Sequence, residues 1–241
     1  MIEKAINKIL ELAKPTLYTD DHGNTWSNKK LIRRPNELLA DPIILTTLKS
    51  LVDFIKEFPN DKKAMPYLVH VVSPVQVVMM SALDTDRNRE KLIEVRAEVP
   101  EFSFGRYMDN ESMLIGVQSK FVDDPNTDRD IVLKFAGTVT TGSVKEYGDD
   151  GVTQKATVRQ GVASKVEAIV PSPCVLRPYR TFMEVEQPAS NFIFRMREGI
   201  GDTVESALFE ADGGAWKLVA KSNIYNYLKD NLQDTGITVI A

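Results

Sequence analysis

The sequence predicts an α+β fold: a large, mainly antiparallel β-sheet with a few flanking helices. Short runs of alternating apolar and polar residues follow one another between residues 67 and 197, and turn-forming residues separate them. Alternation with a period of two is typical of strands that bury one face. These runs lack regular helical crossovers between them, which favours antiparallel pairing over a doubly wound parallel sheet.

The first 60 residues predict a small N-terminal module of helix and hairpin. Apolar residues recur at helical spacing before Pro15: Ile2, Ala5, Ile6, Ile9, Leu10 and Ala13. They predict a helix over residues 2–13. The Asp-His-Gly-Asn cluster at residues 21–24 is typical of a turn and predicts a hairpin within residues 17–26. A second helix is predicted to begin at Asp41-Pro42, where the aspartate can cap it, and to end before Pro59.

Residues 61–241 are predicted to form the main antiparallel α+β domain, with residues 59–66 as the linker. Strands are predicted at residues 68–72, 75–80, 92–99, 131–139, 153–158, 165–170, 174–177, 179–185, 191–197, 216–220 and 236–240. The apolar run over residues 113–121 fits a helix or a strand by local pattern, and a helix is favoured because Asp109 or Asn110 can cap it. Residues 222–232 also predict a helix, whereas residues 204–209 fit either a short helix or a strand.

Size and charge limit the classes of function. The chain has 241 residues, of which 43% are hydrophobic and 27% charged, and its formal net charge is −4. This balance predicts no global attraction to nucleic acid or to an anionic membrane. We find neither a segment long enough to span a bilayer nor a signal peptide, so we expect a cytoplasmic protein. The single cysteine, Cys174, rules out an intramolecular disulfide and is expected to be a small buried residue.

The sequence shows no motif for a cofactor, a metal or a catalytic centre. Glycine loops of the P-loop and dinucleotide types are missing, and one cysteine with two distant histidines gives no zinc spacing. Four aspartates within residues 123–130 suggest a calcium loop, but the central glycine and final glutamate of an EF-hand are missing. We therefore predict a protein that is not an enzyme and has no cofactor.

The candidate binding residues flank a Gln-Pro corner at residues 187–188. They are the charged residues of two predicted strands: Arg177, Arg180, Glu184, Glu186, Arg195 and Arg197. Glu184 and Glu186 would share one side of a strand, roughly 7 Å apart. Such a spacing also occurs between paired carboxylates in glycosidases, so a hydrolase using them, or Asp149 and Asp150, is one alternative. A ladder of ion pairs is favoured over catalysis, with Arg180 paired to Glu184 or Glu186.

A single-stranded nucleic-acid-binding replication accessory protein is another alternative, because arginines hold phosphates and aromatic rings stack on bases. The aromatic residues among these arginines are Tyr179, Phe182, Phe192 and Phe194. On residues 191–197, however, the two phenylalanines share a face with Met196, opposite to Arg195 and Arg197. The phenylalanines are therefore expected in the core, and nucleic acid is not the favoured partner.

Three blocks in the second half of the chain carry a family resemblance. They are residues 149–154 (DDGVTQ) with 158–161 (VRQG), residues 176–197 around the Gln-Pro corner, and residues 207–216 (ALFEADGGAW). Together they resemble the YfdQ-like family of uncharacterised phage and prophage proteins, within residues 65–232. The resemblance implies a phage or prophage gene, and it supplies no catalytic or binding residues.

We therefore expect a phage-encoded, non-enzymatic binding or accessory protein. Its expected partners are copies of itself in a homo-oligomer, and a host or phage protein on which it acts. Nucleic-acid binding and hydrolysis stay open as alternatives, and no membrane association is expected.

Overall fold

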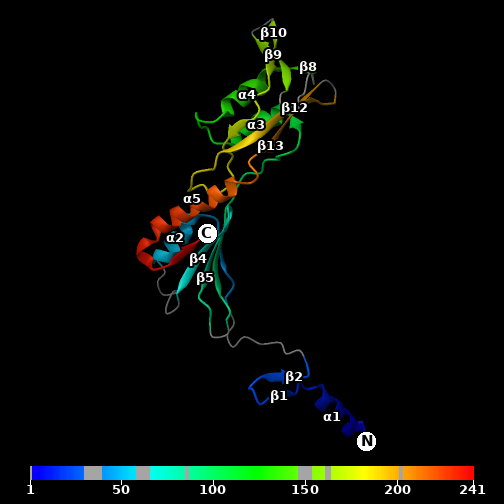
Figure 1. Ribbon diagram of the computed structural model, residues 1–241, viewed down its shortest axis with the longest axis vertical. Coiled ribbons are helices and arrows are strands. Elements are labelled where there is room, and N and C mark those ends of the chain that lie inside the picture. Colours follow the sequence, from blue (N-terminus) through cyan, green and yellow to red (C-terminus); the bar gives the residue numbers. More distant parts are fainter. Residues whose placement is uncertain are drawn as a thin grey trace. The chain divides into compact units, whose positions relative to one another are not determined.

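The computed structural model describes residues 2–29, 40–57, 66–84, 87–145, 154–160, 164–200 and 203–241. The chain divides into two compact units, Met1–Leu39 and Ala40–Ala241 (Figure 1). The domain boundary expected at residue 60 does not coincide with this division, because helix α2 (Leu48–Glu57) packs in a core of the larger unit. Of the predicted linker, residues 59–66, only Pro66 is among the described residues.

The smaller unit contains a helix followed by an antiparallel hairpin, as predicted. These elements are α1 (Ile2–Ala13), β1 (Leu17–Thr19) and β2 (Thr25–Ser27). The Asp20 carboxylate organises the turn by accepting the backbone N–H of Asn24 (2.9 Å) and the indole N–H of Trp26 (3.0 Å). The hydrogen bond from Trp26 is the main cause that lowers the pKa of Asp20, and the bond from Asn24 acts in the same direction. Gly23 adopts a φ of 82°, which favours glycine at this position.

The larger unit has an α+β architecture in which antiparallel pairing predominates, which confirms the predicted fold class. Its other described helices are α3 (Asn110–Lys120), α4 (Arg129–Thr138) and α5 (Trp216–Asn231), with a 3₁₀ turn at Gln233–Thr235. Its described strands are β3 (Ile43–Leu45), β4 (Tyr67–Ser73), β5 (Gln76–Ser81), β6 (Lys91–Arg96), β7 (Met108–Asp109), β8 (Val139–Lys145), β9 (Lys155–Gln160), β10 (Ser164–Ile169), β11 (Cys174–Leu176), β12 (Ser190–Glu198), β13 (Val204–Glu210) and β14 (Thr238–Ile240).

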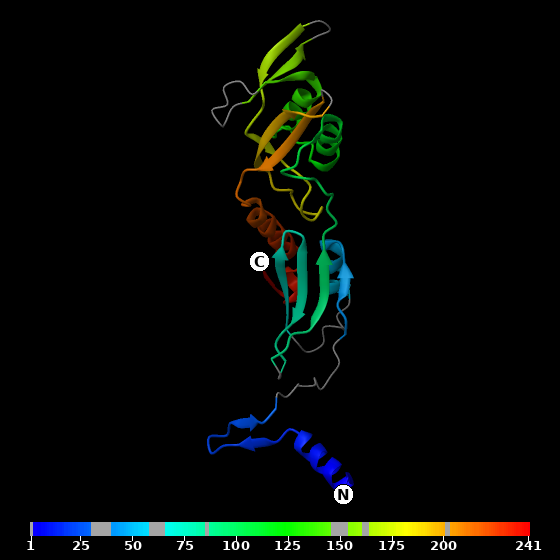
Figure 2. The same ribbon diagram turned by 90° about the vertical axis from the view of Figure 1, so that its right-hand side faces the viewer.

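Helices α2 and α5 cover one face of a five-stranded sheet with the order β14-β4-β5-β6-β3 (Figures 1 and 2). The two edge strands, β14 and β3, pair in parallel with β4 and β6, and the inner pairs are antiparallel. Fully buried residues of both layers form the first core, among them Leu48, Leu51, Ile55, Val69, Val77, Ile93, Ile224 and Leu228. Phe182, from a loop distant in sequence, also inserts into this core.

Helices α3 and α4 pack against the four-stranded sheet β11-β12-β13-β7 and form a second core. The prediction that Phe192, Phe194 and Met196 share the buried face of one strand is confirmed. The predicted cap of α3 is also confirmed, since the Asp109 carboxylate accepts the Ser112 N–H at 2.8 Å. The three-stranded sheet β10-β9-β8 is linked to this core by Gln154, whose amide bonds both the N–H (2.9 Å) and the C=O (2.6 Å) of Met196.

The strand predicted over residues 131–139 is wrong, because Arg129–Thr138 form helix α4. Valine, isoleucine and phenylalanine favour strands locally. Val132 and Ala136, however, lie four residues apart, and this spacing buries both on one helical face in the second core. Packing of that face outweighs the local preference.

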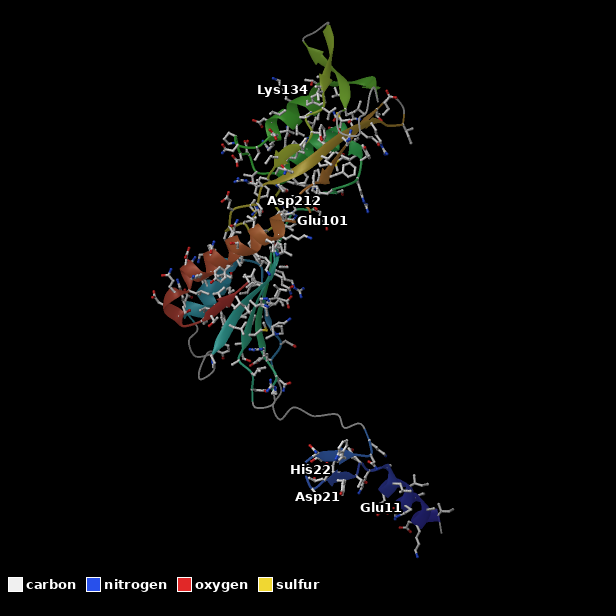
Figure 3. All side chains as sticks on the ribbon, in the orientation of Figure 1. Glu11, Asp21, His22, Glu101, Lys134 and Asp212 are labelled. Atoms are coloured by element: carbon white, nitrogen blue, oxygen red, sulfur yellow. The ribbon has the colours of Figure 1, made fainter. Side chains whose placement is uncertain are left out.

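Two further element boundaries also differ from the predictions. The helix expected from Asp41 begins at Leu48, and Ile43–Leu45 form strand β3, which pairs with β6. The strand expected at residues 216–220 is the start of α5. The Asp212 carboxylate, labelled in Figure 3, accepts the N–H of Gly214 (3.0 Å) and of Trp216 (3.2 Å), the first residue of α5.

The strand predicted at residues 179–185 is also wrong: this segment is a loop organised by the buried side chain of Gln187. Gln187 Oε1 accepts the backbone N–H of Arg180 (2.9 Å) and of Thr181 (3.2 Å). Gln187 Nε2 donates to the C=O of Phe182 (2.9 Å). One side-chain amide therefore provides the partners that a neighbouring strand would otherwise provide.

Replacing Gln187 by alanine is expected to lower the free energy of unfolding by about 2–4 kcal/mol, because buried backbone groups lose their partners. Urea unfolding followed by circular dichroism measures the change. Gln118→Ala, at an exposed position of α3, is the matched control and is expected to change stability by less than about 0.5 kcal/mol. Equal stability of the two variants would contradict the role assigned to Gln187.

Candidate functional site

Arg180 is the most buried of the six predicted binding residues and lies beside the Gln187 loop. Its guanidinium forms an ion pair with Glu210 (Nη1 to Oε1, 2.9 Å). It also donates to the Ser190 hydroxyl and to the C=O of Pro188 (3.3 Å). The expected pairing of Arg180 with Glu184 or Glu186 is therefore wrong, since the end of strand β13 supplies the carboxylate.

Aromatic rings complete the surroundings of Arg180. Its guanidinium carbon lies 4.0 Å from the ring centroid of Trp216 and 5.8 Å from that of Phe192, which are cation–π distances. Burial lowers the pKa of Arg180 to about 10, although Glu210 and Asp212 act in the opposite direction. The guanidinium thus stays charged at neutral pH, and its contacts are internal ones that hold the loop in place.

The two candidate glutamates contact different parts of the larger unit. Glu184 Oε1 accepts the backbone N–H of Lys49 in the first turn of α2, at 3.2 Å. Glu186 pairs with Arg177 (3.0 Å), and the same arginine nitrogen contacts Asp124 (3.2 Å). Because their segment is a loop, the predicted side-by-side arrangement of the two glutamates on a strand is wrong. Residues 149–150, the other proposed carboxylate pair, lie outside the described residues.

Arg195 and Arg197 lie on the face of β12 opposite to the core, as the alternation predicts. The guanidinium of Arg197 pairs with Glu205 on β13 at 2.7 Å. Its carbon also lies 4.1 Å from the ring centroid of Tyr107. Arg195 is half-buried beside it. On the outer face of β12, Arg197 is therefore already paired with a carboxylate.

The six predicted residues do not form one site. They lie at the Gln187 loop, at the Asp124 loop and on the outer face of β12. Arg177, Arg180 and Arg197 each contact at least one carboxylate, which weakens their attraction for phosphate groups. A continuous basic stripe for nucleic acid is therefore not favoured by this arrangement.

A shallow hollow of about 330 Å³ lies between α3 and residues 101–108, and none of the six predicted residues lines it. Its rim carries Glu101 (labelled in Figure 3), Arg106 and Lys120, over the ring of Phe102. Gly116 forms part of the wall, because a Cβ there would lie 2.9 Å from that ring. Both signs of charge meet at the rim, so the hollow has no clear preference for an anion or a cation.

The second face of the five-stranded sheet is the largest feature that the sequence did not indicate. No described helix covers it: α2 and α5 both lie on the opposite side (Figures 1 and 2). Directly paired residues form a row across all five strands: Ile240, His70, Val78, Glu94 and Ile44. Ile44 and Ile240, on the two edge strands, are 54% and 44% exposed, whereas Val78 and Glu94 in the middle of the row are each only 4% exposed. Val72, on the same face of β4, is 41% exposed.

Glu94 lies within this open sheet face and is only 4% exposed because long side chains surround it. Its carboxylate accepts hydrogen bonds from Arg96 (2.6 Å), Gln76 (2.7 Å) and Lys91 (3.1 Å). The bonds from Arg96 and Lys91 are the main cause that lowers the pKa of Glu94 to about 2. Two cations therefore share one carboxylate, and the cluster carries a net positive charge.

The described residues contain no cluster of three or more His, Cys, Asp or Glu side chains arranged to hold a metal. The aspartates of residues 123–130 have other contacts: Asp124 accepts the Asn126 N–H (2.9 Å) and Asp128 accepts the Val175 N–H (2.7 Å). Cys174 is buried, as predicted, and burial raises the pKa of its thiol to about 12. In the described part of the chain, we find no helix with the length and apolar character to cross a membrane.

Sequence reasoning missed the open sheet face and the cluster around Glu94. One signal was available, because Glu94 and Arg96 alternate with Ile93 and Val95 and so share the outer side of β6. The place of Ile44 on a sheet could not be predicted, because its run of apolar residues fits a helix as well as a strand. Ile240 was predicted in a strand, but the sequence does not tell which face of the strand is covered.

Comparisons with protein-family models, with curated proteins and with solved structures found no match to this chain. Functional inference therefore depends on the surfaces of the molecule itself. Of these, the open sheet face combines exposed apolar residues with a charged cluster, whereas the predicted arginines are largely paired internally.

Replacing Arg180 by lysine is expected to lower the free energy of unfolding by about 1–3 kcal/mol, since lysine keeps the charge but loses the planar stack on Trp216. Chemical denaturation of purified protein measures the effect. Arg106→Lys, at an exposed position, is the control and is expected to leave stability unchanged. Similar stability of both variants would show that the Arg180 contacts contribute little.

Glu94→Gln is expected to make stability less dependent on pH. The pKa of Glu94 in the folded protein, about 2, lies below its usual 4.5, so the ionised group stabilises the fold above 4.5 and loses this effect as pH falls towards 2. The variant should be less stable than the natural protein at about pH 7, and the difference should shrink at about pH 3. Urea unfolding at both pH values tests this, with exposed Glu98→Gln as control. A difference independent of pH would contradict it.

Proposed function

We propose that this chain is a phage-encoded, non-enzymatic accessory protein that acts as a homo-oligomer in the host cytoplasm and binds another protein through the open sheet face. The observation that carries the proposal is the exposure of Ile44, Val72 and Ile240 on a sheet whose other face packs against α2 and α5. Apolar side chains gathered on one exposed face are typical of protein-binding surfaces.

The charge of the cluster around Glu94 indicates what kind of protein fits. Lys91 and Arg96 flank one carboxylate, and their side chains are 46% and 63% exposed. A partner surface that carries both apolar side chains and carboxylates complements this face in polarity and in sign of charge. We infer a host or phage protein of that chemistry.

The resemblance to YfdQ-like phage and prophage proteins supports the proposed origin. It rests on residues 149–154, 158–161, 176–197 and 207–216, of which the last two blocks include the Gln187 loop and Trp216. Both of these belong to the internal framework of the larger unit. The resemblance thus supports a shared fold, and the choice of partner depends on the sheet face.

Affinity capture followed by reconstitution tests the proposed surface. The tagged chain is incubated with lysate of phage-infected bacteria, and a captured protein is then purified and titrated by calorimetry. Val72→Glu is expected to weaken binding at least tenfold, because it replaces an exposed apolar side chain of this face by a carboxylate. Ile131→Glu, on α4 at 55% exposure, is the matched control and should bind as the natural chain does.

The outcomes separate the candidate functions. Equal binding by both variants, or no captured protein, would contradict the proposal. Salt-dependent binding of a single-stranded oligonucleotide that is lost in Arg195→Ala or Arg197→Ala would favour the nucleic-acid alternative instead.

A further inference from the structure

Helix α1 (Ile2–Ala13) carries a wide apolar face and has no buried residue. Its large apolar side chains are all more than half exposed: Ile2 77%, Ile6 51%, Ile9 65%, Leu10 57% and Leu12 67%. An isolated helix of this length is marginal in water, and helices in proteins gain most of their stability by packing such a face. The apolar face of α1 is therefore a surface for association.

A lysine that follows the hairpin stabilises the C-terminal end of α1. Lys29 Nζ, just after β2, donates to the C=O of Ala13 (2.5 Å) and to that of Leu12 (3.4 Å). These carbonyls belong to the last turn of α1, where helices lack internal partners. A cation there also interacts favourably with the helix dipole. The C-terminal end of α1 is thus fixed within the smaller unit, and its apolar face stays uncovered.

The spacing of the apolar residues shows which surface fits this face. Ile2, Ile6, Ile9 and Ala13 follow one another at intervals of four, three and four residues. This is the a/d pattern of a coiled-coil seam, with isoleucine at d, a and d in turn. Charged residues stand outside the seam, as Lys8 and Glu11 do, where they pair with each other at 2.9 Å.

The residue types at and beside the seam indicate how many helices assemble. Isoleucine at both a and d positions favours bundles of three or four helices over two. The flanking e and g positions are also largely apolar, with Ala5, Leu10 and Leu12. A two-stranded assembly leaves such positions partly exposed, whereas a larger bundle covers them.

The charge of α1 favours copies of itself over other occupants. Within Ile2–Ala13 the acidic residues Glu3 and Glu11 balance the basic residues Lys4 and Lys8. Several copies can therefore pack side by side without net repulsion. The polar face also lacks the excess of lysine and arginine that is typical of helices bound to anionic membranes. A neutral apolar stripe is complementary to the same stripe on another copy.

We propose that α1 assembles with the same helix of other copies into a bundle of three or four chains. This inference rests on the homo-oligomeric part of the proposed function and deepens it, whereas partner binding depends on the separate sheet face. The 12 residues of α1 supply less than two heptads, so we expect the assembly to be reversible and dependent on concentration.

Sedimentation velocity and light scattering of the full chain over two decades of micromolar concentration test the proposal. The mass is expected to rise towards three or four times that of the monomer. Ile6→Asp should keep the chain monomeric throughout, because it places a carboxylate in the seam. Asn7→Asp, one residue away on the polar face, is the matched control and should assemble. Unchanged thermal unfolding of the larger unit will show that Ile6→Asp leaves that unit intact.

A second variant tests the seam itself. Changing both d positions, Ile2→Leu with Ile9→Leu, leaves isoleucine at a and leucine at d, a combination that favours two strands. We expect this variant to form dimers.

Four outcomes would overturn the bundle. A natural chain that is monomeric at every concentration would overturn the whole homo-oligomeric proposal, whereas a natural dimer would overturn only the bundle. Assembly that survives Ile6→Asp would place the contact elsewhere. Monomers that bind vesicles of phosphatidylcholine and phosphatidylglycerol, and lose this binding in Ile6→Asp, would assign the face to a membrane.

Discussion

The hydrogen bonds of Gln187 are the interaction on which the larger unit depends most. By bonding the backbone of Arg180, Thr181 and Phe182, this side chain holds a loop that takes part in both halves of the unit. Phe182 fills the core beneath the five-stranded sheet. Two residues earlier, the stacked guanidinium of Arg180 bonds the ends of β12 and β13, through Ser190 and Glu210. One loop conformation therefore places Phe182 in the first core and Arg180 against the ends of β12 and β13.

The buried arginine also limits what the chain can do. Removing a guanidinium from water is costly unless a carboxylate and further acceptors compensate, and Arg180 has both. The charge of Arg180 is therefore used in contacts within the folded chain. The same holds in weaker form for Arg177 and Arg197, which face carboxylates at the surface. Two exposed apolar surfaces remain: the open sheet face of the larger unit, which also carries the cluster around Glu94, and the exposed face of α1.

The sequence predicted an element correctly where its local pattern was unambiguous. Helix α1, the hairpin and the burial pattern of β12 were predictable, because periodicity, turn residues and alternation each allow one interpretation there. Residues 131–139 and 179–185 were mispredicted, because apolar β-branched residues and alternating charges fit a strand equally well. Tertiary contacts determined both structures. Burial of Val132 and Ala136 favours a helix in the first segment, and the Gln187 amide replaces a sheet partner in the second. The pairing expected for Arg180 failed similarly, since Glu210 is distant from it in sequence, whereas Arg177 does pair with Glu186.

The two apolar surfaces have a combined consequence for binding. If the open sheet face binds a partner as proposed, its half-exposed residues Ile44, Val72 and Ile240 offer a modest contact area, and one copy alone would bind weakly. The proposed assembly of three or four copies would carry as many faces, and a partner with repeated sites would then meet the second face at a high effective concentration. Avidity gained in this way adds no new contact to the interface. Self-assembly through α1 would therefore set the strength of partner binding, while the chemistry of the sheet face would set its specificity.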